Sequence, residues 1–115
     1  MGAANCLFCK IFRGEIPVQA VARTEDALAF RDLNPQAPSH VLVIPKRHVE
    51  HLSEFMAIAS PEEVHALFAL AAEVGTKASS GGYRVVTNQG VDAGQTVFHL
   101  HLHVLAGRAM RWPPG

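Results

Sequence analysis

Within residues 96–105, near the C-terminal end of the chain, apolar and polar residues alternate strictly from Phe98 to Val104. This period of two predicts a β-strand, because successive side chains of a strand point to opposite faces of its sheet. One face would carry the apolar Phe98, Leu100, Leu102 and Val104, and the other would carry His99, His101 and His103. A slip of one residue would bury the histidines, so the apolar set fixes the register. Successive histidines would then stand about 6.5 Å apart on a rigid support.

Two segments have the apolar spacing of a helix. The first covers residues 6–13, with Asn5 as the expected N-cap. The second covers residues 60–79, where Ser60 is the expected N-cap and Glu63 completes a capping box. We therefore predict one short helix near the N-terminus and one long helix in the second half of the chain.

Short runs rich in β-branched or alternating apolar residues predict four further strands, at residues 18–23, 27–31, 40–44 and 83–88. Segments rich in Gly, Pro and Asn predict loops between them, at residues 34–39 and 89–95. Five strands with one long and one short helix predict an α+β fold built on a five-stranded antiparallel sheet. The 115 residues fit a single domain that spans residues 1–115.

Composition narrows the classes of function. Hydrophobic residues make up 49% of the chain and charged residues 17%, which is typical of a globular protein. Ten basic residues balance ten acidic ones, which argues against long nucleic acid or an anionic membrane as a partner. The N-terminal stretch lacks the apolar region of a signal peptide, so we expect a cytoplasmic protein. In such a protein the spacing Cys6-x-x-Cys9 suggests a metal or redox pair more than a disulfide.

The three alternating histidines admit three interpretations. The first is a strand with a polar outer face, which strict alternation beside a Gly-Gln turn disfavours. The second is a metal site, because His-x-His on a strand can chelate zinc, although no carboxylate lies in the same strand. The third is nucleophilic catalysis, because a neutral imidazole is a good nucleophile toward phosphorus and leaves readily from the adduct.

The segment His99–Leu105, HLHLHVL, resembles the histidine triad motif, in which three histidines alternate with apolar residues. The resemblance extends to Cys6–Ile16 (CLFCKIFRGEI), Ala29–Arg47 (AFRDLNPQAPSHVLVIPKR), the loop before the triad and the ending Arg111–Gly115 (RWPPG). The chain is thus similar to histidine triad (HIT) proteins over nearly its whole length. The Trp-Pro-Pro-Gly ending resembles the Hint branch of that family.

This resemblance implies a HIT-like homodimer whose two sheets join into one of ten strands. It also implies hydrolysis of purine nucleoside 5′-phosphoramidates, such as AMP-amines and AMP-lysine, through a covalent nucleotidyl-histidine, and binding of AMP or GMP. No cofactor would be required for the chemistry. The catalytic histidines would be His101 as the nucleophile, His103 at the phosphate, His40 beside His101, and His99.

The resemblance further implies a nucleotide pocket. Its apolar wall would be formed by Leu7, Phe8, Ile11, Phe30 and Leu33. Asp32 would accept the ribose hydroxyls, since an ionised carboxylate accepts charge-assisted hydrogen bonds. The phosphate would be surrounded by Asn88, Gly94, Gln95, Thr96, His101 and His103. Glycine lets such a loop aim its N–H groups at phosphate oxygens without Lys or Arg. Taken alone, the apolar residues would be assigned to the core and Asp32 to a solvated turn.

A structural zinc ion is the third implication. Cys-x-x-Cys is a common zinc half-site, and in some bacterial relatives with this pair the remaining ligands match two histidines here. The resulting ligand set is Cys6, Cys9, His48 and His99. The alternative is that both cysteines are small buried apolar residues of an amphipathic helix.

Two other functions stay open beside the phosphoramidase. One is a hydrolase of dinucleoside polyphosphates, from a sister branch of the family. The other is a nucleotide-binding or regulatory dimer in which turnover is incidental. The intact His101 argues against a role in binding alone, and turnover assays separate all three.

Overall fold

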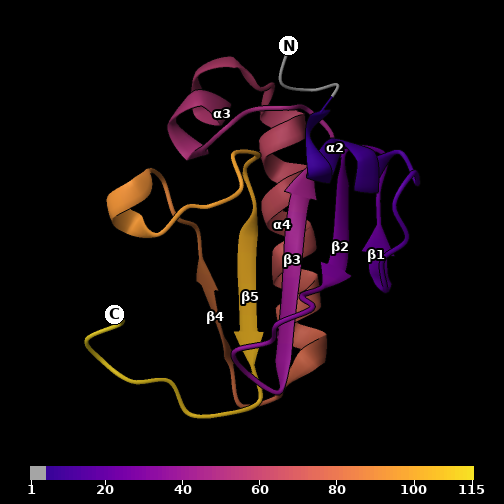
Figure 1. Ribbon diagram of the computed structural model, residues 1–115. Coiled ribbons are helices and arrows are strands. Elements are labelled where there is room, and N and C mark those ends of the chain that lie inside the picture. The colour runs from indigo at the N-terminus through magenta and orange to yellow at the C-terminus, as the bar shows by residue number, and fades with distance from the viewer. Residues whose placement is uncertain (1–4) are drawn as a thin grey trace.

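The computed structural model describes residues 5–115. Residues 1–4, at the start of the stretch in which we expect no signal peptide, lie outside the described residues. The chain forms a five-stranded antiparallel sheet in the order β1-β2-β3-β5-β4 (Figure 1). Its strands are β1 (Ala20–Arg23), β2 (Ala27–Arg31), β3 (Ser39–Pro45), β4 (Tyr83–Val86) and β5 (Leu102–Ala106). Its helices are α2 (Leu7–Phe12), α3 (Leu52–Ile58), α4 (Pro61–Ala78) and the short 3-10 helix η1 (Val91–Ala93). The predicted α+β class and five-stranded antiparallel sheet are confirmed.

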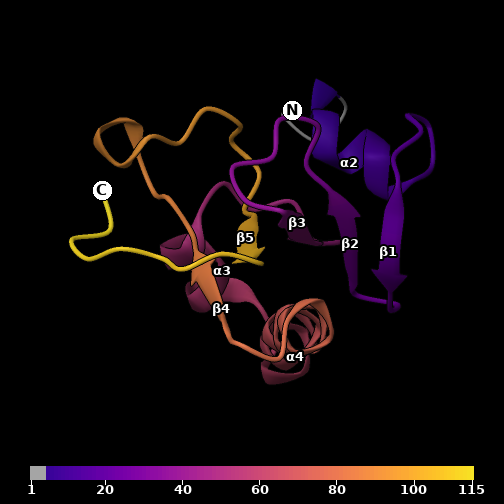
Figure 2. The same ribbon diagram turned by 90° about the horizontal axis from the view of Figure 1, so that it is seen from below.

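The long helix α4 covers one face of the sheet, as Figure 2 shows. It begins as predicted: the hydroxyl of Ser60 accepts the N–H of Glu63, and the carboxylate of Glu63 accepts the N–H of Ser60. The side chains buried between α4 and the sheet form the main core: Leu67, Leu70, Ala71 and Val74 from the helix, with Ala27, Ala29, Val41, Val43, Leu102 and Val104 from the strands. The capping box and helical spacing therefore predicted this helix correctly.

A second apolar cluster covers the opposite face of β2 and β3, under α2. It consists of Phe8, Ile11 and Phe12 from the helix, with Leu28, Phe30, Leu42 and Ile44 from the strands. Because both faces of these strands are covered, their sequences are continuous apolar runs instead of alternating ones. We call the side of the sheet that α2 covers the α2 face.

The strand predicted over residues 96–105 is wrong in its first half. β5 begins only at Leu102, because neither β3 nor β4 pairs with earlier residues. Residues 96–101 run instead beside the segment that follows β3, and the N–H of Leu100 donates to the carbonyl of Val49 at 2.8 Å. The alternation of apolar residues thus begins at Phe98, four residues before the first residue of β5 that pairs with a neighbouring strand.

Two side chains are therefore placed differently from the prediction. Phe98, which we expected on the core face, is 45% exposed. His99, which we expected on the outer face, is fully buried. Only His103 of the three triad histidines lies in a strand.

The short helices differ from the prediction in two respects. Helix α3 was not predicted, because its N-cap is the unusual His51, whose Nδ1 accepts the N–H of Glu54 at 3.3 Å, and only Phe55 of the helix is buried. The N-cap of α2 is Cys6 instead of Asn5, and its sulfur accepts a helix N–H at 3.4 Å. Among residues 5–115, no helix has both the length and the apolar character that crossing a membrane requires.

Candidate active site and metal centre

His101 lies on the segment that leads into β5, and its ring is held in one orientation. Its Nδ1 lies 2.8 Å from the carbonyl oxygen of His99, and a carbonyl only accepts, so Nδ1 carries the proton. Phe8 of α2 packs edge-on against the ring, with centroids 5.1 Å apart and an interplanar angle of 89°. Burial lowers the pKa of His101 below its ordinary value. The ring is therefore neutral near neutral pH and has its lone pair on Nε2.

His103 and His40 form a second pair beside His101 on the α2 face. Nε2 of His40, on β3, lies 2.9 Å from Nδ1 of His103, on β5. The ring of His103 lies 5.0 Å from that of His101, centroid to centroid. Burial lowers the pKa of His103 to about 4, and it also lowers the pKa of His40. Three of the predicted catalytic histidines thus meet as neutral rings.

Asp32 follows β2 and lies next to this pair. Its Oδ2 is 3.4 Å from Nε2 of His40, and its Oδ1 accepts the N–H of Asn34 at 2.8 Å. The side chain is 20% exposed, so lone pairs remain open to ligand hydroxyls. The structure therefore brings the predicted ribose acceptor within reach of the histidines.

The predicted apolar wall is only partly assembled. Phe8, Ile11 and Phe30 are buried, and the rings of Phe8 and Phe30 meet edge-on with centroids 5.8 Å apart. Leu7 is 45% exposed, and Leu33 is 97% exposed. The structure groups the two phenylalanines near His101 and leaves Leu33 in solvent.

In the loop before the triad, the N–H groups of Gly94 and Gln95 are used internally, so these two are not free to bind phosphate as we expected. The N–H of Gly94 donates to the carbonyl of Val91, and the N–H of Gln95 donates to the carbonyl of Gly90. These two hydrogen bonds close the turn and satisfy both donors. The glycine content of the loop predicted the turn but not where its donors point.

The side chain of Gln95 also supports the loop and is 5% exposed. Its Nε2 donates to the carbonyls of Glu50 and Val97, at 2.6 and 3.2 Å. Thr96 is exposed and Asn88 is half-buried, so both remain accessible to a ligand. Of the predicted phosphate-binding residues outside the triad, these two are the ones with accessible side chains.

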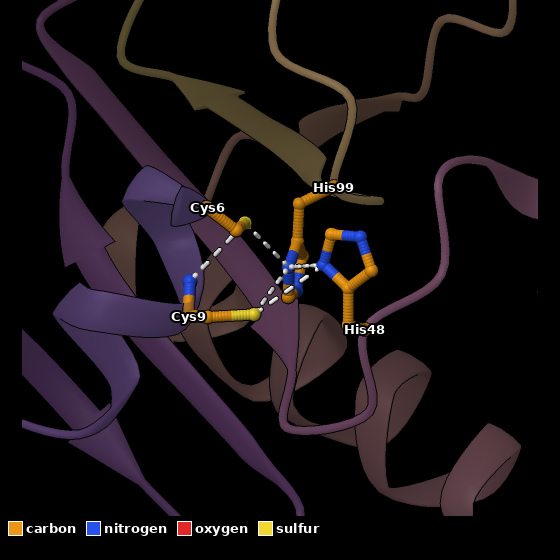
Figure 3. Close-up of side chains that lie close together, drawn as sticks. All are labelled: Cys6, Cys9, His48 and His99. Carbon is orange, nitrogen blue, oxygen red and sulfur yellow. Dashed lines mark hydrogen bonds between the residues drawn. The ribbon is translucent and has the colours of Figure 1, made fainter. Parts of the chain in front are cut away.

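Cys6, Cys9, His48 and His99 converge on one point, as Figure 3 shows. One ligand atom from each lies within 4.8 Å of all the others. Nδ1 of His99 is 3.3 Å from Sγ of Cys6 and 3.5 Å from Sγ of Cys9. Nδ1 of His48 is 3.3 Å from Sγ of Cys9 and 3.2 Å from Nδ1 of His99. All four residues predicted to bind zinc are therefore brought together.

These separations fit the ligand shell of a tetrahedral zinc ion. Zn–S bonds of about 2.3 Å and Zn–N bonds of about 2.0 Å place sulfur and nitrogen ligands about 3.5 Å apart, and two nitrogens about 3.3 Å apart. The measured S···N distances of 3.3 to 3.5 Å and the N···N distance of 3.2 Å agree with both values. The N–H at Nε2 of His99 donates to the carbonyl of Pro45 at 3.0 Å, which leaves Nδ1 free to bind metal.

The thiol and the surroundings of the cluster also suit a metal ion. Burial raises the pKa of the Cys9 thiol to about 11, so at neutral pH this thiol keeps its proton until a cation replaces it. A cavity of about 360 Å³, lined by Cys6, His48 and Thr96 among others, adjoins the cluster. This cavity offers an entry path for a metal ion.

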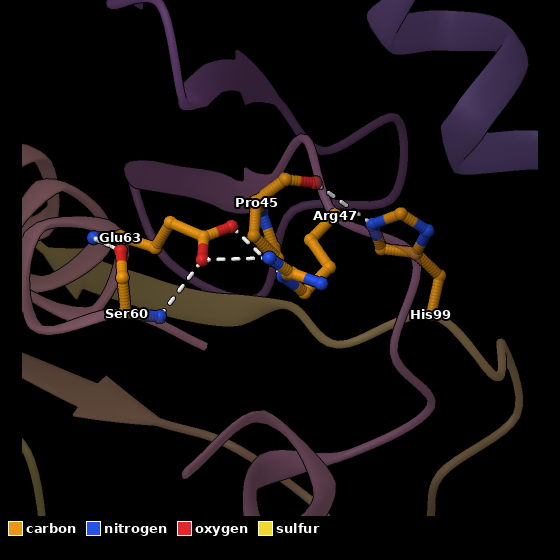
Figure 4. A network of polar contacts seen from close by, with 5 residues as sticks. All are labelled: Pro45, Arg47, Ser60, Glu63 and His99. Atoms are coloured by element: carbon orange, nitrogen blue, oxygen red, sulfur yellow. Dashed lines mark hydrogen bonds and ion pairs between the residues drawn. The ribbon is translucent and has the colours of Figure 1, made fainter. Parts of the chain in front are cut away.

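The segment that follows β3 is bound to the start of α4 through Arg47 and Glu63, as Figure 4 shows, and His48 is the next residue in this segment. Nε and Nη2 of Arg47 donate to the carboxylate of Glu63 at 2.8 and 2.9 Å. These hydrogen bonds contribute most to lowering the pKa of Glu63 to about 2. Pro45, two residues before Arg47, accepts the N–H of His99. The end of β3 therefore positions both histidines of the cluster.

The sequence did not predict two hydrogen bonds that support the triad segment and the loop before it. The hydroxyl of Thr87 donates to the carbonyl of His101 at 3.0 Å, next to the triad. Oε1 of Gln89 accepts the N–H of Ser53 at 3.0 Å and joins the loop to α3. Each links a side chain to the main chain of a distant segment, and such contacts leave no pattern in the sequence.

The HIT domain profile matches residues 13–110 of this chain. The chain belongs to the HIT family. Its structure is similar to that of a HIT family hydrolase from Legionella pneumophila, with a TM-score of 0.88, 43% identity, and coverage of 96% of this chain and 100% of that one. The family and fold expected from the triad motif are thus confirmed.

Two other relatives of the chain carry zinc in their names. A "14 kDa zinc-binding protein" of Zea mays is 41% identical over 122 residues, which cover 95% of this chain and 87% of that one. A zinc-bound histidine triad family protein from Mycobacterium smegmatis has a TM-score of 0.81 and 34% identity, covering 93% of this chain and 78% of that one. Together with the Cys/His cluster, these relatives support the expected structural zinc.

Proposed function

We propose that this HIT protein belongs to the Hint branch and hydrolyses purine nucleoside 5′-phosphoramidates, with His101 as the nucleophile. The observation that carries the proposal is the hydrogen bond from the Nδ1–H of His101 to the carbonyl of His99. It selects the neutral tautomer whose lone pair is on Nε2, and a nucleophilic imidazole needs that lone pair. The ending Trp112–Gly115 supports the Hint branch.

The proposed reaction consists of two displacements at phosphorus. In the first, the Nε2 lone pair of His101 forms a bond to phosphorus, the P–N bond of the substrate breaks, and the departing amine takes up a proton. In the second, water attacks phosphorus and loses a proton, the bond to Nε2 breaks, and the nucleoside monophosphate leaves. The ring becomes cationic while it carries the nucleotide, and the carbonyl of His99 stabilises that charge through Nδ1–H.

The proposed nucleotide pose follows from the groups around His101. The purine packs against Phe8 and Phe30, whose rings meet beside His101. The ribose hydroxyls donate to Asp32, and the phosphate lies next to His103 and the exposed Thr96. An apolar base pocket discriminates weakly between similar purines, so both AMP and GMP are expected to bind.

A turnover panel tests this function. The purified protein is given adenosine 5′-phosphoramidate, AMP-lysine and a dinucleoside polyphosphate. We expect hydrolysis of both P–N substrates, and loss of turnover in His101→Ala with AMP affinity kept within about tenfold. His65→Ala is the matched control, because this histidine is exposed on α4. Turnover of the polyphosphate alone would assign the chain to a sister activity, and binding without any turnover would make it a nucleotide-binding protein.

We further propose that Cys6, Cys9, His48 and His99 hold one structural zinc ion. The support is the match of their separations to a tetrahedral shell. A bound zinc ion would tie α2 to the segments that carry the two histidines. Thiolate ligands persist in a reducing compartment, which is consistent with the proposed cytoplasmic location.

A homodimer is the third proposal. β4 is an edge strand of the sheet, and the side chains of Tyr83 and Val85 on it are about two-fifths exposed, at 38% and 40%. Phe68 of α4 is 40% exposed. A free strand edge with apolar side chains is a ready template for pairing with a second copy. Pairing of β4 with β4 would join two sheets into one of ten strands.

A further inference from the structure

The loop over residues 34–39 links the buried histidine pair to the C-terminal tail through Gln36. The main-chain N–H of Gln36 donates to Nδ1 of His40 at 3.0 Å. The carbonyl of the same residue accepts from Nε and Nη2 of Arg108, at 3.3 and 3.1 Å. Neither Gln36 nor Arg108 has a role in the site described above.

The contact with Gln36 determines where His40 carries its proton. A main-chain N–H can only donate, so Nδ1 of His40 has to accept and is bare. His40 is 5% exposed and burial lowers its pKa, so the ring is neutral and its one proton is on Nε2. That N–H faces two acceptors, Nδ1 of His103 at 2.9 Å and Oδ2 of Asp32 at 3.4 Å. Both contacts fit a proton on Nε2 and none on Nδ1.

The proton position of His103 follows from its contact with His40. Because Nδ1 of His103 accepts from His40, the neutral ring carries its proton on Nε2. In the hydrogen bonds formed within residues 5–115, Nε2 of His103 has no partner, and the side chain is half-buried. Its N–H is therefore open to an anionic ligand beside His101.

The tail is packed closely enough to hold Gln36 in place. Gly107 has a φ of +98°, and a Cβ at this position would lie 2.8 Å from Cβ of Pro38, so the main chain of the tail passes directly against the loop. Arg108 then reaches the Gln36 carbonyl with two N–H groups, and its Nη1 donates to the carbonyl of Ala109 at 3.1 Å. The loop and the tail are thus joined by packing and by hydrogen bonds.

We propose that Arg108 is a positioning residue: by holding Gln36 against His40, it fixes the tautomers of His40 and His103 and makes His103 a hydrogen-bond donor to the phosphate. The phosphate as ligand rests on the proposed function. With the opposite tautomers, His103 would present a lone pair to the phosphate oxygens and repel them. The chain has no Lys or Arg in the predicted phosphate site, so this donor matters for binding.

Nitrogen-15 NMR of the protein reports the tautomers directly, because protonated and bare ring nitrogens differ strongly in chemical shift. Near neutral pH we expect a bare Nδ1 and a protonated Nε2 in both His40 and His103. A proton on Nδ1 of either ring would overturn the proposal, whatever the activity of the protein.

Two matched variants of the tail test the role of Arg108. In Arg108→Gln we expect His40 to populate both tautomers and AMP affinity to fall about tenfold, the effect of weakening one hydrogen bond to an anion. Arg111→Gln removes the same charge from the same tail but lies outside the contact with Gln36, so its tautomers and affinity should match the wild type. Equal tautomer populations in Arg108→Gln and the wild type would refute the role.

The tautomer measurement separates this inference from the proposed function. If Arg108→Gln shifts the tautomers but the wild type hydrolyses no phosphoramidate, the function fails and the positioning role stands. If the wild type is active and the tautomers do not depend on Arg108, the function stands and the positioning role fails.

Discussion

The Nδ1–H of His101 donates to the main-chain carbonyl of His99 at 2.8 Å, while the ring of His99 points its own Nδ1 into the Cys/His cluster. The proposed nucleophile is thus hydrogen-bonded to the main chain of a proposed zinc ligand. Any change that moves His99 also moves the group that orients His101. The proposed metal centre and the proposed active site are therefore linked through one short segment, residues 99–101.

The first prediction concerns this coupling. His48→Ala should abolish zinc binding and lower the melting temperature by roughly 10 °C, because a structural metal stabilises only the folded chain. It should also lower kcat/KM although His101 is untouched. Elemental analysis of protein purified without chelator, calorimetry and the turnover assay measure the three effects. His65→Ala should change none of them, and one zinc per chain in His48→Ala would exclude His48 as a ligand.

The second prediction concerns Glu63, which completes the capping box of α4 and binds Arg47. Glu63→Gln should lower the free energy of unfolding by about 1 kcal/mol, a value limited by solvent screening because the Arg47 side chain is 42% exposed. The folded-state pKa of Glu63 is lowered from 4.5 to about 2, so the carboxylate's contribution is complete above pH 4.5 and disappears as the pH falls toward 2. Urea unfolding at several pH values measures it.

A matched carboxylate serves as the control for Glu63. Glu73 forms an exposed i,i+4 pair with Lys77 on the same helix, at 3.0 Å. Glu73→Gln should cost only about 0.3 kcal/mol, as expected for such pairs. Equal losses in the two variants would mean that the contacts of Glu63 are no more stabilising than a surface pair.

The third prediction concerns Gly75, inside α4. A Cβ at this position would lie 2.3 Å from Cδ2 of Tyr83, so the helix needs glycine where the ring packs. Gly75→Ala should destabilise the fold by about 1–2 kcal/mol, because overpacking outweighs the gain in helix propensity. Adding Tyr83→Ala should remove that penalty, and Gly81→Ala, where the nearest atom is 3.5 Å away, should be nearly neutral. A stabilising effect of Gly75→Ala in the wild-type background would contradict the packing.

The sequence predicted an element of the fold correctly when residues close together in the chain determine that element. The capping box of Ser60 and Glu63 lies within four residues, and α4 begins where it indicates. The strand predicted over residues 96–105 was wrong in its first half, because no neighbouring strand pairs with it. Whether a neighbour is present depends on segments that are distant in the sequence. Helix α3 was not predicted, because His51 is a rare N-cap and only one side chain of the helix is buried.

In the candidate site, too, local sequence signals were predictive and contacts between distant segments were not. The triad motif located His101 and His103, and Cys6-x-x-Cys9 indicated half of the metal cluster, because these signals are short spacings. The hydrogen bonds that close the turn around Gln95, and the link between Gln36 and Arg108, were not predicted. They depend on main-chain groups, which every residue carries, and so leave no mark in the sequence.

The fourth prediction concerns the proposed dimer. Val85→Lys, on the free edge of β4, should convert the protein to a monomer, because a charged side chain blocks edge-to-edge pairing. Val21→Lys is the matched control, since Val21 is 41% exposed on β1 at the opposite edge of the sheet. Light scattering gives the mass of each variant. A wild-type monomer at micromolar concentration, or a dimer lost only in Val21→Lys, would contradict pairing through β4.

The central claim is that His101 carries the nucleotide covalently. The most direct test is to quench the protein during turnover of adenosine 5′-phosphoramidate under conditions that preserve P–N bonds, and to map the adduct by mass spectrometry. The account predicts one AMP group on the peptide that contains His101, localised to that residue, and none in His101→Ala. An adduct on another residue, or phosphoramidate turnover that persists in His101→Ala, would contradict it.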